Sequence, residues 1–227
     1  MLPANRRPIT IHTADGLKLI GEVATPISNR VGSILCLHPN PTGGGMMDSH
    51  IYKKAANRLP ALAGISVVRF NTRGTTSDAG TSEGTFTNGD EEGNDVEALL
   101  NYCFDELALN NLWVVGWSFG TDLALQYAKD PRHQGLILLS PPLQRTTVEQ
   151  LKYWNTDPRP VIALVPELDS FLPPDQAKER FAPLSKIEII EVAEAKHLWV
   201  GEPSVYRVLS EIVKRVAPTK LPLPTEY

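Results

Sequence analysis

The sequence has few cysteines, no long apolar run and no excess of positive charge. Two cysteines among 227 residues form neither a disulfide framework nor a zinc knuckle. Both Cys36 and Cys103 lie in apolar stretches, so we expect buried free thiols. The 22 Lys and Arg against 26 Asp and Glu give a net charge of −4, which disfavours a nucleic-acid partner. No run approaches the roughly 18 apolar residues of a membrane span, so we expect no membrane partner.

Several targeting and cofactor signals are absent as well. The N-terminal residues MLPANRRP lead into an alternating pattern instead of the apolar segment of a secretory signal, which favours a cytoplasmic location. The sequence has no His-Glu-x-x-His motif or His/Cys cluster, and no Gly-Lys-Ser/Thr follows the glycines at 43–45 as in a P-loop. We therefore expect no cofactor and no metal.

The composition and length are those of an ordinary globular domain. Hydrophobic residues make up 42% and charged residues 21%, which is typical of a packed soluble core. A chain of this length can bury such a core without disulfides. We expect one domain over residues 1–227, with 217–227 as an extended C-terminal tail.

Strand and helix patterns alternate along the chain. An Asp15-Gly16 hairpin signal separates two short strands, Ile9–His12 and Leu17–Ala24. From residue 33 on, apolar strand patterns alternate with helical ones, which predicts an α/β fold with a mostly parallel twisted sheet and helices on both faces. Ligands bind such sheets beyond the carboxyl ends of the strands. The expected strands are 33–38, 65–70, 112–116, 136–139, 161–165 and 187–190, and the expected helices are 47–60, 91–107, 119–129, 174–182 and 202–216.

A candidate nucleophile follows the strand at 112–116. The segment Gly116-Trp117-Ser118-Phe119-Gly120 has the G-x-S-x-G pattern of a nucleophile elbow, between an apolar strand and a helical pattern. This chemistry requires a serine on a sharp turn, with small residues where the backbone segments approach closely. Because a serine hydroxyl alone is a weak nucleophile, it needs a general base and a carboxylate that orients the base.

Three carboxylates compete for the orienting role after the strand at 161–165. Asp175 has the position of a first-turn acid in the next helix, where it stabilises the helix dipole. Glu167 comes directly after the strand, in a position that favours exposure to solvent. Asp169 lies on the turn that points back towards the elbow, so we predict that Asp169 orients the base.

Five histidines are candidates for the base. His12 lies in the N-terminal hairpin, away from the strand tips, and His50 and His133 lie in polar segments expected to be exposed. His38 ends a strand, and we expect it to hold the following loop by a structural hydrogen bond. His197 follows the last strand just before the final helix, where the order Ser, Asp, His places the base.

Two backbone amides are candidates for an oxyanion hole. One is the N–H of Phe119, directly after the candidate nucleophile. The second should come from the loop after the strand at 33–38, where Pro39 and Pro41 have no N–H and Asn40 between them has one. A rigid turn with a purely structural role remains the alternative interpretation of this loop.

These residues together resemble the α/β-hydrolase superfamily, and among its members the small lidless bacterial serine hydrolases similar to dienelactone hydrolases. The resemblance covers roughly residues 17–216 and includes the segments at 38–45, 69–74, 82–84 and 89–95. It differs from dienelactone hydrolases in one respect, because they carry cysteine at the position of Ser118. The resemblance implies a nucleophile, an orienting acid, a base and two amide donors at Ser118, Asp169, His197, Asn40 and Phe119.

The connection between the strands at 136–139 and 161–165 bears on the substrate. About 20 residues are too few for the helical cap that many relatives insert there, so we expect an open, shallow site without a cap domain. Four aromatic residues could either line this site or pack in the core: Trp117, Trp154, Phe171 and Trp199.

The sequence thus predicts a cofactor-independent serine hydrolase for small acyl esters or thioesters. Arg69, Asn71 and Arg73 are expected to be structural. A peptidase or an acyltransferase would use the same residues, and a binding protein could use the same fold without catalysis. The sequence gives no indication of the oligomeric state.

Overall fold

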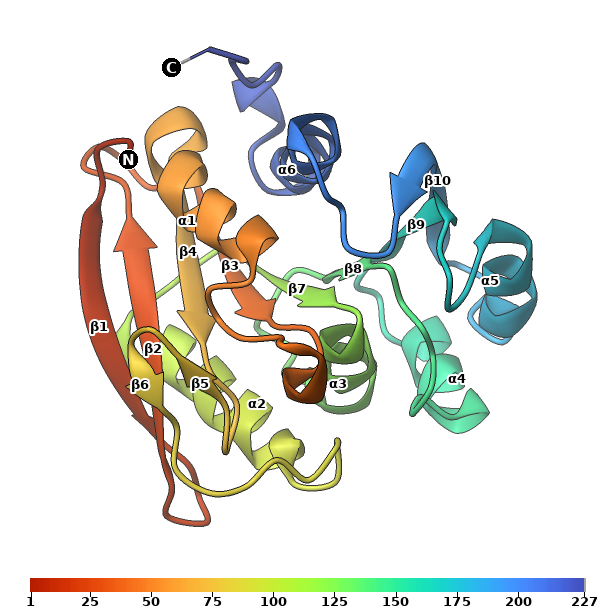
Figure 1. Ribbon diagram of the computed structural model, residues 1–227, viewed down its shortest axis with the longest axis horizontal. Helices are drawn as coiled ribbons and strands as arrows, with labels where there is room; N and C mark the ends of the chain where they lie inside the picture. Colours follow the sequence, from red (N-terminus) through yellow and green to blue (C-terminus); the bar gives the residue numbers. More distant parts are fainter. Residues whose placement is uncertain (227) are drawn as a thin grey trace.

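In the computed structural model, which describes residues 1–226, eight strands form one twisted sheet (Figure 1). The strand order is β1-β2-β4-β3-β7-β8-β9-β10. The first two strands form the antiparallel hairpin around Asp15-Gly16, and β2 pairs antiparallel with β4. All pairs from β4 to β10 are parallel, as the sequence predicts. The bounds are β1 (Asn5–His12), β2 (Lys18–Thr25), β3 (Gly32–Leu37), β4 (Ile65–Phe70), β7 (Leu112–Trp117), β8 (Leu136–Leu139), β9 (Val161–Leu168) and β10 (Glu188–Lys196).

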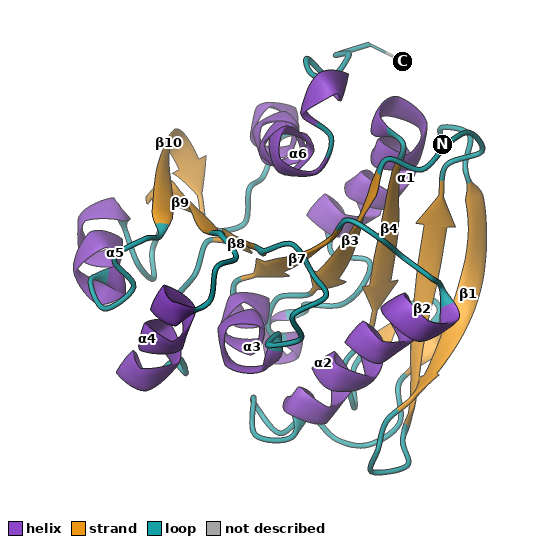
Figure 2. Cartoon of the chain, turned by 180° about the vertical axis from the view of Figure 1, so that it is seen from behind, coloured by secondary structure: helices purple, strands orange, loops and turns teal. Residues whose placement is uncertain are grey.

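Helices cover both faces of this sheet. Figures 1 and 2 show α1 and α6 on one side and α2, α3 and α4 on the other. The hydrophobic core has two clusters, one on each face of the sheet. Residues of α2, α3, α4 and α5 belong to one cluster, and residues of α1 and α6 belong to the other. The bounds are α1 (His50–Ala63), α2 (Glu92–Asn101), α3 (Phe119–Tyr127), α4 (Val148–Thr156), α5 (Pro174–Phe181) and α6 (Glu202–Val216).

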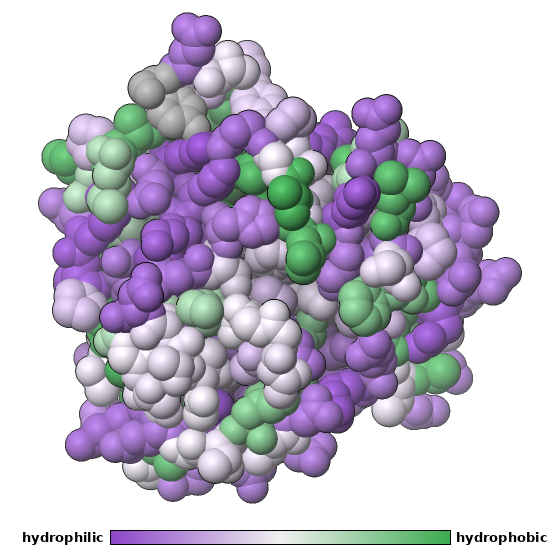
Figure 3. Space-filling model, in the orientation of Figure 1, coloured by the Kyte–Doolittle hydropathy of each residue, from purple (hydrophilic) through white to green (hydrophobic). Residues whose placement is uncertain are grey.

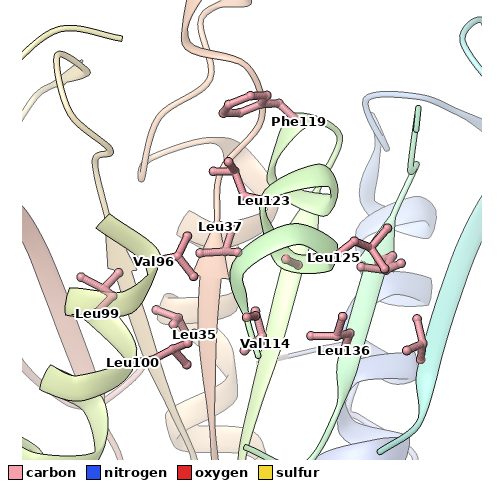
Figure 4. Packing of buried hydrophobic residues seen from close by; sticks show 14 of the residues in the cluster. Leu35, Leu37, Val96, Leu99, Leu100, Val114, Phe119, Leu123, Leu125 and Leu136 are labelled. Atoms are coloured by element: carbon pink, nitrogen blue, oxygen red, sulfur yellow. The ribbon is translucent and has the colours of Figure 1, made fainter. Parts of the chain in front are cut away.

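The central strands are buried on both faces, which explains their continuous apolar sequences. In β3, Leu35 and Leu37 point to the face covered by α2 and α3, whereas Ile34 and Cys36 point to the face covered by α1 and α6. Figure 4 shows Leu35 and Leu37 near the side chains of α2 and α3. Both cysteines are free and buried, as expected.

Helix α1 differs from the expected helix over 47–60. It begins three residues later, after Ser49, and the N–H of Met47 before it donates to the side chain of Asn71. It also continues through Pro60 to Ala63. A proline in a helix leaves the carbonyl four residues earlier without its usual donor. Here the Arg6 guanidinium donates to that carbonyl, of Ala56, at 3.2 Å, so the helix continues.

The other helices and strands differ less from the bounds expected from the sequence. The expected helix over 91–107 is α2 followed by a π-helical turn, Tyr102–Glu106. Both β9 and β10 extend beyond the expected ends, and they pair in parallel up to Val192 before the register shifts. Residues expected as loop contain the short strands β5 (Thr76–Ser77) and β6 (Gly80–Thr81).

Ion pairs of two buried arginines hold the segment after β4, in line with the structural role expected for Arg69 and Arg73. The buried guanidinium of Arg69 pairs with Glu22 at 2.7 Å and Asp48 at 2.8 Å. That of Arg73 pairs with buried Asp95 at 2.8 Å. These contacts fix the start of the 71–90 segment at the carboxyl edge of the sheet.

The connection between β8 and β9 carries α4, which begins at a capping box formed by Thr147 and Gln150. Its buried Leu151 and Trp154 belong to the core cluster beneath the sheet. The connection therefore forms no lid over the strand ends. After α6, a 3₁₀ turn (Pro218–Lys220) leads to Leu223, which is buried, and its carbonyl accepts a hydrogen bond from Tyr206.

Candidate active site

Three side chains from separate loops meet at the carboxyl edge of the sheet. Ser118 follows β7, Asp169 follows β9 and His197 follows β10. The Nε2 atom of His197 lies 2.8 Å from the Ser118 hydroxyl oxygen. Its Nδ1 lies 3.0 and 2.9 Å from the two carboxylate oxygens of Asp169. The structure thus brings together the three residues that the sequence singles out.

Ser118 occupies a sharp turn between β7 and α3. Its backbone has φ 52° and ψ −119°, a strained conformation that is uncommon for any residue except glycine. The flanking glycines make room for this turn. A Cβ on Gly116 would lie 2.4 Å from the carbonyl oxygen of Gly120, and one on Gly120 would lie 2.0 Å from that of Leu37. The elbow therefore packs directly against the end of β3.

The backbone of His197 is held by the strands that neighbour the nucleophile. Its carbonyl accepts the indole N–H of Trp117 at 3.2 Å and the hydroxyl of Ser140 at 3.0 Å. The next part of the loop is held by His50, whose Nε2 lies 3.1 Å from the Trp199 carbonyl. Sequence reasoning missed Ser140 and His50 as anchors, although Ser140 follows β8 directly, at the same edge as the site.

The hydrogen bonds determine the protonation pattern of the site. An ionised carboxylate can only accept, so Nδ1 of His197 carries the proton and Nε2 accepts from the Ser118 hydroxyl. Burial tends to raise the pKa of Asp169, but the hydrogen bonds from His197 and from the N–H groups of Phe171 and Leu172 offset it and hold the pKa below its ordinary value. Asp169 is thus ionised near neutral pH and fixes the tautomer of the imidazole.

The two other carboxylates near this loop point elsewhere. Glu167, within β9, is exposed and accepts the N–H of Glu194 at 2.8 Å. Asp175 lies in the first turn of α5 with its side chain almost fully exposed, and its partner is Lys178 at 3.5 Å.

Of the remaining histidines, His12 is exposed as part of β1, whereas His38, His133 and His50, which is half-buried and not exposed as expected, make structural contacts. His38 holds the loop that follows it by hydrogen bonds, as expected. The expectation that His133 is exposed is wrong. It is 1% exposed, its Nε2 lies 2.7 Å from the Ala128 carbonyl, and its ring packs near Trp154. The N–H of the next residue, Gln134, donates to the Leu112 carbonyl, so the segment after α3 returns to the sheet at this point.

The loop after β3 presents a candidate amide donor beside the elbow. The Asn40 carbonyl accepts from the N–H groups of Gly43 and Gly45, and its side-chain oxygen accepts from the backbone and hydroxyl of Thr42. Among the described residues, no protein group accepts the N–H of Asn40. The N–H of Phe119 lies in the first turn of α3, where helical amides have no partner within the helix.

Of the four aromatic candidates, only Phe171 borders the site with an exposed face. Trp117, Trp154 and Trp199 are at most 2% exposed and belong to the core. Phe171 is 55% exposed, and its ring centroid lies 4.4 Å from that of His197.

A hollow of about 380 Å³ lies between the loop after β3, the start of α1 and the segment after His197, and no triad side chain lines it. Its lining includes the neighbours of three site residues: Pro39 next to Asn40, Trp117 next to Ser118, and Leu198 next to His197. Leu198 and Val200 are 54% and 72% exposed, so this rim is apolar. Figure 3 shows hydrophobic side chains over the segment that joins β10 and α6. The other lining residues are Gly43, Gly44, Gly45, Met46, Asp48, Ser49, His50 and Val200.

Residues 1–226 contain neither a metal-binding cluster nor a membrane-spanning helix. No three His, Cys, Asp or Glu side chains in this range are grouped as a metal site would need. Within the same range, no helix combines the length and the hydrophobicity that crossing a bilayer requires.

Solved structures with the same architecture exist, whereas no family model and no curated protein matches the sequence. XC6422 from Xanthomonas campestris, described as an α/β serine hydrolase without lid, is 24% identical, with a TM-score of 0.77 over 100% of this chain and 99% of its own. An α/β serine hydrolase homologue from Coxiella burnetii is 24% identical, with a TM-score of 0.76 over 96% of this chain and 100% of its own. The Pyrococcus furiosus esterase Pf2001 is 17% identical, with a TM-score of 0.77 over 95% of this chain and 91% of its own.

At these identities the likeness establishes the fold. The expected features of that fold are present: a mostly parallel sheet, helices on both faces and no cap over the strand ends. The chain therefore has the lidless α/β-hydrolase fold.

Proposed function

We propose that this protein is a serine hydrolase that cleaves small acyl esters or thioesters through an acyl-enzyme intermediate. The observation that carries the proposal is the continuous hydrogen-bonded path from the Ser118 hydroxyl through His197 to Asp169. A serine, an imidazole and a buried carboxylate in this order form the arrangement that activates a hydroxyl for attack on a carbonyl. The names of the similar structures, a serine hydrolase and an esterase, support the same class.

The proposed reaction has two halves. The Ser118 oxygen attacks the acyl carbon while Nε2 of His197 takes the hydroxyl proton, and the imidazolium then gives this proton to the departing alkoxide or thiolate. In the second half, a water molecule gives its proton to Nε2 and attacks the acyl carbon; the bond to Ser118 then breaks, Nε2 returns the proton to the Ser118 oxygen, and the acid is released. Asp169 stays ionised and stabilises the imidazolium through Nδ1.

Backbone amides would stabilise the charge on the substrate oxygen. In the tetrahedral intermediate the carbonyl oxygen becomes negative, and fixed N–H donors lower the free energy of that state by about 2.7–4 kcal/mol each. We assign this role to the N–H groups of Asn40 and Phe119, which lie on the two backbone segments that Gly120 brings together.

The surroundings of the site favour a small, apolar acyl group. The hollow lined by neighbours of Ser118, His197 and Asn40 has a volume of about 380 Å³, which is at the small end of ligand pockets. Its rim residues Leu198 and Val200 are apolar, and no lid lies over the strand ends to form a long tunnel. Long acyl chains would therefore remain largely in water.

A fluorophosphonate probe and a substrate panel test the proposal. We expect one covalent adduct per chain on Ser118, and turnover of short p-nitrophenyl esters or acyl thioesters that Ser118→Ala abolishes. Ser185→Ala, an exposed serine bonded to Asn155, is the matched control and should keep full activity. Folded protein without an adduct would favour a binding protein. Faster cleavage of peptides than of esters would favour a peptidase, and acyl transfer to an added alcohol in preference to water would favour an acyltransferase.

A further inference from the structure

The imidazole of His38 connects two loops at the carboxyl edge of the sheet. Its Nε2 lies 3.1 Å from the backbone nitrogen of Thr72, and its Nδ1 lies 2.7 Å from the carbonyl oxygen of Pro39. A backbone N–H can only donate, so Nε2 is the acceptor and Nδ1 carries the proton that is donated to Pro39. The ring is 1% exposed, and burial lowers its pKa to about 4, so this neutral tautomer persists at neutral pH.

The acceptor of that hydrogen bond belongs to the same peptide group as the Asn40 N–H. A peptide group is planar, and the bond between Pro39 and Asn40 is trans, so its C=O and N–H point in opposite directions. A hydrogen bond that holds the Pro39 oxygen therefore also fixes the direction of the Asn40 N–H.

Other contacts restrict the same peptide group. A Cβ on Gly45 would lie 1.9 Å from the Pro39 oxygen, so the backbone of Gly45 packs closely against it. The carbonyl of Asn40 accepts hydrogen bonds from Gly43 and Gly45, at 3.0 and 2.9 Å. The N–H groups of residues 42–45 are thus all used within the loop, whereas no described group accepts the Asn40 N–H.

We infer that His38 is a positioning residue for the oxyanion hole, acting through the Pro39–Asn40 peptide group. The path runs from the Thr72 N–H to the imidazole, from the imidazole N–H to the Pro39 oxygen, and from the Asn40 N–H to the substrate oxygen. Because hydrogen bonds in a chain polarise one another, donation to the Pro39 oxygen strengthens the Asn40 N–H as a donor. This inference rests on the proposed function and concerns the transition state, in which the charge on the substrate oxygen is largest.

Two substitutions separate this role from simple tethering of the loops. In His38→Asn, the side-chain amide nitrogen can take the place of Nδ1 and still donate to Pro39, but nothing reaches Thr72. In His38→Gln, the side-chain oxygen can take the place of Nε2 and accept from Thr72, but the donor to Pro39 is lost. We expect His38→Gln to lower kcat by roughly 10–100-fold with little change in KM, less than the 10²–10³-fold that loss of an oxyanion donor costs. We expect His38→Asn to keep kcat within a few-fold of the wild type.

Binding of a boronic acid that forms an anionic tetrahedral adduct with Ser118 provides a second measurement. In His38→Gln, the affinity for the boronic acid should fall by the same factor as kcat, whereas KM should stay close to the wild-type value. Equal losses of kcat in both variants, or a larger loss in His38→Asn, would overturn the inference and leave tethering to Thr72 as the role of His38.

The wild-type protein provides a test that does not depend on the folding of either variant. If His38 acts through this peptide group, the Nδ1 proton resonance of His38 and the Asn40 amide resonance should both shift in nuclear magnetic resonance spectra when the boronate adduct forms. A shift of the Asn40 amide without any change at His38 would overturn the inference. Wild-type protein without Ser118-dependent turnover would instead refute the proposed function.

Discussion

Substitution of Gly120 by alanine tests whether close packing of the elbow on β3 sets the geometry of the site. A Cβ at this position would lie 2.0 Å from the Leu37 carbonyl oxygen and 2.9 Å from that of His38. Both atoms belong to backbone, and Leu37 lies in a strand paired on both sides, so neither can rotate away.

The size of the effect follows from these distances. Real Cβ contacts are essentially never shorter than 3.0 Å, so the elbow and the end of β3 must move apart by about 1 Å. A displacement of that size between a nucleophile and its partners costs about 10²-fold in rate. Inserting a methyl group into a packed interior costs about 1–3 kcal/mol of stability, and each kcal/mol lowers Tm by roughly 2–4 °C for a chain of this size.

The assay compares Gly120→Ala with Ser185→Ala, the exposed control position. We expect Gly120→Ala to lower the rate of fluorophosphonate labelling at Ser118 by about two orders of magnitude and to lower Tm by several degrees. Ser185→Ala should change neither the labelling rate nor Tm. If the Gly120→Ala protein reacts at the wild-type rate with the wild-type Tm, the packing described for the elbow is wrong.

Three further predictions concern the acid, the hollow and the stability. Asp169→Asn should lower kcat by about 10⁴-fold in steady-state assays with little change in Tm, because the amide no longer fixes the imidazole tautomer; a loss below tenfold would contradict the role of this carboxylate. Gly43→Val adds a side chain at the wall of the hollow, so the preferred acyl length of an ester series should become shorter, whereas an unchanged profile would place the acyl group elsewhere. The pKa values of His38 and His133, lowered from 6.5 to about 4 by burial, mean that the unfolded chain binds more protons between these pH values. Each histidine should therefore lower the free energy of unfolding by up to roughly 3 kcal/mol as the pH falls from 6.5 towards 4. Equal free energies of unfolding at pH 7 and pH 4.5, measured by urea titration, would contradict this.

The sequence predicts those parts of the site that depend on local pattern and topology. The G-x-S-x-G segment between an apolar strand and a helix is a local signal, and the structure has a strained elbow at Ser118. The positions of Asp169 and His197 follow from the rule that loops after parallel strands share one edge. The same rule predicts that His38 lies near the site, and the structure shows how it holds its loop.

Other features depend on contacts between distant segments and could not be predicted in this way. The carbonyl of His197 is fixed by Trp117 and Ser140, which are far from it in sequence. Helix α1 continues through Pro60 because Arg6, from β1, donates to the carbonyl left without a partner. His133 lies in a polar stretch but is buried, because burial depends on how the segment after α3 returns to the sheet. In each case the tertiary fold brings together the residues that make the contact, and the local sequence does not show this.

Trapping of the acyl-enzyme tests the central claim most directly. The protein is mixed with p-nitrophenyl acetate, quenched with acid within milliseconds and digested for peptide mass spectrometry. We predict one acetyl group on the peptide that contains Ser118, formed at the rate of the p-nitrophenol burst and missing in His197→Ala. Acetylation at another residue, or a burst of the same size in His197→Ala, would contradict the proposed nucleophile and base.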